Sequence, residues 1–150
     1  MSNLADILDT KVDDIEKPPL PPMGTYVMAV EKFEQVERGD WKIIEIFFKG
    51  VRPTEDVDED DLKDFGGVES VKLRNAFMFG DDEASNATTK YALRRFIAEH
   101  LQVEGAEDGS LGQALANSVN HQCFVTCVHT PSKKNPEDSF ANVKSTAPLE

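Results

Sequence analysis

Three observations in the sequence predict an all-β barrel with one main helix. The 150 residues are 39% hydrophobic, which is enough for one domain with a single core. After a proline-rich step at Pro18–Pro22, five short segments alternate or carry apolar runs as strands do, and turn residues separate them. One longer segment with helical spacing lies between the third and the fourth. This is the element order of an OB-fold, so we expect a five-stranded OB-fold over residues 23–146.

Residues 1–22 form an acidic and proline-rich extension before this domain. Apolar residues follow helical spacing, which predicts a short amphipathic helix capped by Ser2 or Asn3 and carrying Leu4, Ile7, Leu8, Val12 and Ile15. The prolines fix φ and remove donors, so we expect an extended step that positions the first strand. Residues 147–150 are expected to be a C-terminal tail that includes cloning residues.

The first three strands are expected at Thr25–Gln35, Trp41–Val51 and Ser70–Phe79, with a turn at Arg38-Gly39-Asp40 and an acidic loop over Pro53–Gly67. The second strand is apolar on both faces, with Trp41, Ile43 and Phe47 on one and Ile44, Ile46 and Phe48 on the other. One of these faces is therefore covered or used for binding, and a homodimer interface there stays open. In the third strand Val71, Leu73, Phe77 and Phe79 are expected to face the core, and Lys72, Arg74, Ala76 and Met78 to point away.

The main helix is expected over Ala87–Leu101, capped by Ser85 or Asn86. Its apolar stripe is Ala87, Tyr91, Leu93, Phe96, Ile97 and Leu101. A second short helix is expected at Ser110–Asn117. The last two strands are expected at His121–Thr130 and Ser139–Ser145, joined by a hairpin loop over Pro131–Asp138.

The net charge is −12, but its distribution matters more than its sum. Residues 1–22 carry a net −3 and residues 53–64 a net −6, so most of the excess acid lies in the extension and in one loop. The barrel itself can present a basic face. We find no secretory signal, no apolar run that spans a bilayer, and no disulfide framework in the two cysteines, so we expect a cytoplasmic protein without a membrane partner.

Neither a metal site nor an enzyme is expected. His121, Cys123, Cys127 and His129 share one strand face, but the two histidines would stand roughly 26 Å apart and the two cysteines roughly 13 Å apart. Asp56–Asp60 begins like a calcium loop, but Asp61 stands where glycine is needed and Gly67 where a glutamate is needed. No phosphate-binding, nucleophile or zinc-protease motif occurs, and no cofactor is implied. A metal-dependent nuclease is a weak alternative, because its carboxylates must project from rigid elements.

Aromatic and basic residues gather on the second and third strands and in the last loop. They are Trp41, Lys42, Phe47, Lys49, Arg52, Lys72, Arg74, Lys133 and Lys134. Proteins that bind single strands combine a cationic groove for phosphates with rings that stack on bases. In an OB-fold the face of strands two and three and the loops one–two and four–five form that groove. The opposing interpretation is that Trp41 and Phe47 belong to the core and that the lysines are simply solvated.

The segment Pro19-Leu20-Pro21-Pro22-Met23-Gly24-Thr25-Tyr26, with Trp41–Val51, Tyr91–Leu101 and Gln122–Val143 after it, resembles a family of small bacteriophage proteins encoded among replication and recombination genes. The resemblance implies a single-stranded-DNA-binding protein that acts in the host cytoplasm, and it identifies no binding residue. Many such proteins recruit replication partners through an acidic tail. The sequence ends Ser145-Thr146-Ala147-Pro148-Leu149-Glu150, so that tail is absent or was removed. The acidic loop Glu55–Asp64 either serves that purpose or competes with DNA for the groove.

The main alternative is an acidic protein–protein adaptor or DNA mimic that acts on a nucleic-acid enzyme through the acidic loop and the N-terminal helix. The surface charge around Lys49, Lys72 and Arg74 discriminates between the two. A basic groove there favours DNA, and continuous negative potential favours the adaptor.

Overall fold

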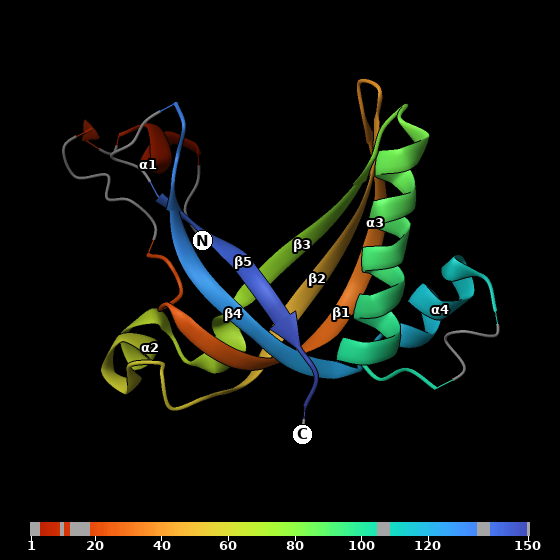
Figure 1. The fold of residues 1–150 in the computed structure, drawn as a ribbon. Coiled ribbons are helices and arrows are strands. Elements are labelled where there is room, and N and C mark those ends of the chain that lie inside the picture. Colours follow the sequence, from red (N-terminus) through yellow and green to blue (C-terminus); the bar gives the residue numbers. More distant parts are fainter. Residues whose placement is uncertain (1–3, 10, 13–18, 105–108, 135–138, 150) are drawn as a thin grey trace.

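In the computed structural model, which describes residues 4–9, 11–12, 19–104, 109–134 and 139–149, five strands form one antiparallel sheet (Figure 1). The strands are β1 (Gly24–Arg38), β2 (Trp41–Pro53), β3 (Lys72–Phe79), β4 (Gln122–Pro131) and β5 (Ser139–Ala147). Their order in the sheet is β3-β2-β1-β4-β5. Between the described residues of the two edge strands, β3 and β5, no ladder forms, so the sheet is not closed. The prediction of a mainly β protein with a few helices is confirmed.

The helices are α1 (Leu4–Leu8), α2 (Glu59–Phe65), α3 (Glu83–Arg95) and α4 (Leu111–Ser118). A 3₁₀ turn, η2 (Val68–Ser70), precedes β3, and a π-helix, η3 (Phe96–His100), continues α3. In the part of the chain that the structure describes, no helix is long and apolar enough to cross a membrane.

The side chains of β2 point alternately to the core and to the opposite surface of the sheet. Ile46 and Phe48 are buried in the main core and Ile44 packs against it, whereas Phe47 between them is only half-buried and belongs to the other face. The core face of β2 therefore carries Ile44, Ile46 and Phe48, which is one of the two apolar faces that the sequence predicted for this strand.

The core face of β2 and β3 is covered by the end of the main helix. The Phe96 ring meets Phe48 edge-on, with centroids 5.9 Å apart and an interplanar angle of 90°. It also packs against Phe77 at 5.8 Å. These contacts sit among the buried residues Leu93, Ile97 and Leu101, so one layer of helix lies over one face of the sheet.

The main helix begins earlier than expected, and its stripe is narrower. Asp82 is the N-cap, because its carboxylate accepts from the Ala84 N–H at 3.2 Å and the Ser85 hydroxyl at 2.7 Å. Asn86 instead binds both backbone groups of Gly80, at 2.9 and 2.8 Å. Ala87 and Tyr91 are exposed, so their place in the predicted stripe was wrong.

The acidic loop predicted over Pro53–Gly67 was wrong in its second half, which forms α2. Asp58 caps this helix by accepting from the Asp61 N–H at 3.0 Å, and Gly66 ends it with φ 116°. Glu59, Asp60 and Asp61 lie in the first turn, where carboxylates favour the positive end of the helix dipole. The run of acids that suggested a loop is thus also a helix-starting sequence.

The proline segment anchors the start of β1. The Tyr26 hydroxyl donates to the Pro22 carbonyl at 2.6 Å, and His129 Nε2 donates to the Pro21 carbonyl at 2.7 Å. Burial of Tyr26 raises the pKa of its hydroxyl, which stays a donor at any ordinary pH. The extended step at the prolines therefore fixes where the first strand enters the sheet.

Several boundaries differ from those expected by a few residues. The helix α1 is shorter than the predicted amphipathic helix, its apolar residues are exposed, and Ser2, Asn3 and Ile15 lie outside the described residues. The cap Ser110 accepts from the Gln113 N–H of α4 at 3.1 Å. The end of the predicted β4–β5 loop, residues 135–138, also lies outside the described part.

Replacement of Phe96 by alanine is expected to destabilise the protein by about 3–5 kcal/mol, because it removes the ring that joins the helix to β2 and β3. Urea denaturation followed by circular dichroism measures this free energy of unfolding. The control is Tyr91→Ala, which truncates an exposed ring on α3 and should change stability by less than about 0.5 kcal/mol. Equal effects of the two substitutions would contradict this packing.

Candidate nucleic-acid interface

The sheet surface opposite α3 is called the outer face here. Cross-strand partners lie on the same face, so the register places Val36, Ile43 and Met78 in one row, and Glu34, Glu45 and Ala76 in the next. A third row holds Lys32, Phe47 and Arg74, and Lys49 and Lys72 follow it. Glu31 is the extra residue of a bulge in β1 and joins this face through Lys72.

A groove of about 390 Å³ crosses from the outer face of β2 and β3 to the edge strand β5. Its lining combines two aromatic rings, two cations and aliphatic or polar neighbours: Phe47, Lys72, Leu73, Arg74, Phe140, Ala141 and Asn142. Phe140 is 48% exposed, and Phe47 is half-buried. The groove therefore follows the seam where the edge strands β3 and β5 approach without pairing.

Three lysines surround one carboxylate at the end of the outer face near this groove. Lys72 Nζ lies 2.7 Å from Glu31 Oε2. This hydrogen bond, with further attraction from Lys49 and Lys32, holds the pKa of Glu31 below its ordinary value. Lys32 also pairs with Glu34 at 3.0 Å, so three lysines face two carboxylates and this end of the face keeps a positive excess.

Two arginines meet a second carboxylate near the middle of the face. Glu45 Oε1 lies 3.5 Å from Arg74 Nη1 and 3.7 Å from Arg38 Nη2. The Glu45 side chain is 6% exposed, whereas the arginine side chains are 54% and 65% exposed. A carboxylate this buried needs charged partners, and both guanidinium groups lie on its solvent side.

The two aromatic residues predicted on β2 occupy the outer face at different positions. Trp41 is 49% exposed and its ring lies over Gly80, where an added Cβ would come within 2.9 Å of the ring. Phe47 carries the Lys32 ammonium 4.9 Å from its ring centroid. Neither ring belongs to the main core, so the interpretation of both as core residues was wrong.

The structure brings together only part of the predicted set. Phe47, Lys49, Lys72 and Arg74 share the outer face, and Trp41 lies further along it towards the β1–β2 hairpin. Lys42 alternates onto the opposite face and pairs with Phe79. Lys133 and Lys134 are exposed in the β4–β5 connection, which leads to Phe140 in the groove.

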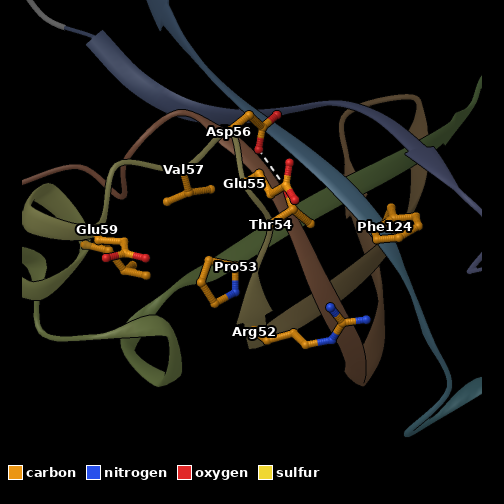
Figure 2. A pocket seen from close by; sticks show the side chains of 9 residues that line it. Arg52, Pro53, Thr54, Glu55, Asp56, Val57, Glu59 and Phe124 are labelled. Atoms are coloured by element: carbon orange, nitrogen blue, oxygen red, sulfur yellow. Dashed lines mark hydrogen bonds between the residues drawn. The ribbon is translucent and has the colours of Figure 1, made fainter.

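Arg52 lines a separate pocket of about 850 Å³ (Figure 2). A bulge opposite Val27 and Met28 shifts the register before Arg52, which puts it beside Phe124 and the acidic segment. Glu55, Asp56 and Glu59 line this pocket and are absent from the lining of the groove. In the described structure the acidic segment therefore does not occupy the groove.

Asp56 ties the acidic segment to the start of β1. Its carboxylate accepts from the Thr25 N–H at 2.8 Å, the Thr25 hydroxyl at 3.0 Å and the Thr54 hydroxyl at 2.7 Å, the last drawn in Figure 2. These hydrogen bonds, the Thr25 N–H first, lower the pKa of Asp56. Gly24 has φ 138° and a side chain there would meet Val57, so this contact also depends on glycine.

His121, which precedes β4, and the β4 residues Cys123, Cys127 and His129 do not have metal-binding geometry. Cys123 and Cys127 are buried and free, and His121 and His129 bond to the Leu101 and Pro21 carbonyls. Among the described residues, no group of three or more histidines, cysteines or acids could hold a metal ion.

Four residues of the outer face and the groove were not predicted from the sequence: Arg38, Lys32, Glu45 and Phe140. Phe140 alternates with Ala141 and Val143 in the last strand, so the two-residue period of a strand could have predicted that its side chain points outwards. Arg38 was read only as a turn residue, although it pairs directly with Trp41. The contacts of Glu45 with Arg38 and Arg74 join three strands, so no local pattern in the sequence indicates them.

Comparison with known proteins finds no matching family model and no matching curated protein.

Asp56→Asn is expected to destabilise the protein at neutral pH by about 1–2 kcal/mol, because hydrogen bonds to a carboxylate are lost or weakened. The folded-state pKa of Asp56 is lowered from its ordinary value, so Asp56 stabilises the fold above the ordinary carboxyl pKa and this stabilisation is lost as pH falls through the lowered value. The difference in melting temperature from wild type should therefore shrink in acid. An exposed carboxylate, replaced in Asp64→Asn, is the control, and equal, pH-independent effects would contradict this role.

Cys123 and Cys127 are expected to resist thiol reagents at mildly alkaline pH while the protein is folded. Burial raises the pKa of Cys123 to about 12 and also raises that of Cys127, so both stay protonated and shielded. Spectroscopic thiol counting in native buffer and in denaturant measures this. Rapid reaction of either thiol in native buffer would show that β4 is not buried as described.

Proposed function

We propose that this protein binds single-stranded DNA without strong sequence preference, as an OB-fold protein in phage DNA replication or recombination. The observation that carries the proposal is the groove in which Phe47, Lys72, Arg74 and Phe140 converge. The rings offer stacking surfaces for bases, and the cations of the groove offer partners for phosphates. These are the two requirements of sequence-tolerant binding.

The arrangement of strands supports the OB-fold assignment. An OB-fold is a partly open five-stranded barrel that binds its ligand on strands two and three and with the loops one–two and four–five. Here the groove crosses β2 and β3 and reaches β5. Figure 1 shows the β1–β2 hairpin and the end of β4 as two arms that rise on opposite sides of β3. In this proposal the two arms flank the bound strand.

The charge of the outer face favours DNA over the acidic adaptor. Arg38, Arg74 and the lysines 32, 49 and 72 outnumber the carboxylates Glu31, Glu34 and Glu45 on this surface. The dense acids of α2 lie beside the other pocket. Within the described part of the chain, the dense acids of the acidic segment therefore lie away from the groove, and partner recruitment through this segment is compatible with DNA binding.

A non-enzymatic role is part of the proposal. Within the acidic segment, Asp56 is engaged in hydrogen bonds to Thr25 and Thr54, which suits a structural residue. The groove contains rings and cations, and among the described residues no carboxylate lines it.

Titration with oligo-dT tests the proposal, with Trp41 as the single tryptophan and an oligonucleotide label as a second signal. We expect quenching of the Trp41 fluorescence and increased anisotropy of the labelled oligonucleotide. The logarithm of the binding constant should fall with the logarithm of the salt concentration, with a slope of roughly −0.7 for each phosphate contact. Phe140→Ala should weaken binding by roughly 1–3 kcal/mol, the value of one stacked base.

The matched control is Arg95→Ala, an exposed and ion-paired arginine on α3, away from the outer face. It should leave binding unchanged. No response of either signal at low salt would overturn the proposed function, and binding that Arg95→Ala weakens as much as Phe140→Ala would place the DNA elsewhere.

A further inference from the structure

One carboxylate on the outer face is buried under two cations. The Glu45 side chain is 6% exposed, and a single oxygen, Oε1, contacts Arg38 Nη2 at 3.7 Å and Arg74 Nη1 at 3.5 Å. Arg38 comes from β1 and Arg74 from β3, on either side of β2. One buried residue thus draws guanidinium groups from both neighbouring strands towards the same point.

The charges at this point do not cancel. One carboxylate faces two guanidinium groups, and the arginine side chains remain 65% and 54% exposed. Each guanidinium carries five N–H donors, of which a single carboxylate oxygen can use few. The remaining donors and one net positive charge are available on the solvent side, which is the chemistry that binds a phosphate.

We propose that Arg38 and Arg74, positioned by the buried Glu45, form a binding site for one backbone phosphate of the single strand. This inference rests on the proposed function and adds Arg38 and Glu45 to it. Arg74 touches the phosphate from the groove side and Arg38 from the hairpin side. Glu45 touches no ligand and is a positioning residue.

The place of the phosphate site along β2 indicates the path of the bound DNA strand. Phe47 lies two residues from Glu45 and Trp41 lies four residues away on the other side, roughly 7 Å and 13 Å along an extended strand. The phosphate site therefore lies between the exposed ring of Trp41 and the half-buried ring of Phe47. A strand held there by its phosphate can place bases on Phe47 at one side and on Trp41 at the other.

The test compares two substitutions that change the charge equally. Glu45→Gln removes the carboxylate that holds both arginines, and Glu34→Gln removes an exposed carboxylate in the same row that pairs with Lys32 at 3.0 Å. We expect Glu45→Gln to weaken oligo-dT binding several-fold, although it makes the face more positive, and Glu34→Gln to leave binding unchanged or tighten it. If both variants bind more tightly than wild type, Glu45 only repels DNA and the positioning role is wrong.

Arg38→Ala tests the site without disturbing a buried residue. We expect an affinity loss of roughly five- to tenfold and a salt dependence reduced by roughly 0.7, the value for one phosphate contact with a single strand. Arg38→Lys should restore the salt dependence more than the affinity, because lysine keeps the charge and loses the planar fork.

Two outcomes separate this inference from the proposed function. If wild type binds oligo-dT and Arg38→Ala behaves as the control Arg95→Ala does, the phosphate site is wrong and the proposed function stands. If wild type does not bind at all, the proposed function is wrong and the phosphate site with it.

Discussion

The packing of Phe96 against Phe48 and Phe77 decides which surface of the sheet is left for a ligand. It holds the end of the main helix on one face of β2 and β3, so that the even-numbered residues of β2 from Ile44 to Phe48 turn inwards. Trp41, Ile43, Glu45 and Phe47 must then lie on the other face, because side chains alternate along a strand. The positions of the aromatic rings and the charged groups on the outer face thus depend on a hydrophobic contact on the opposite face of the sheet.

The outer face combines that constraint with a particular use of charge. Both Glu31 and Glu45 lie among cations that outnumber them, and Glu45 is almost fully buried. Exposed ion pairs such as Lys72–Glu31 contribute little to stability, but they order long side chains that would otherwise lose conformational entropy when a ligand binds. A surface arranged in this way is weakly charged overall, and its cations are held near the groove before any ligand arrives.

The sequence predicted the strands well because apolar alternation and turn residues are local signals. It identified the inward residues of β3, and the basic residues Lys72 and Arg74 opposite them, from period two alone. It could not choose between the faces of β2, since both are apolar and only the contact with Phe96 distinguishes them. The predictions for Arg52 and Lys42 show a second limit: a bulge moved Arg52 to another pocket, and simple alternation put Lys42 on the helix side. The acids of α2 were interpreted as a loop because of their density of charge. Asp58 and Gly66, which cap the two ends of this helix, were not recognised as helix signals.

The central claim is that a single strand lies along the outer face of β2 and β3 and reaches β5. A two-dimensional NMR titration of isotopically labelled protein with oligo-dT tests it most directly, because every backbone amide reports its own surroundings. The account predicts the largest shift changes at Arg38, Phe47, Lys72, Arg74 and Phe140, with little change along α3. Changes that concentrate on α2 and the pocket of Arg52 and Phe124, with the outer face unaffected, would contradict it.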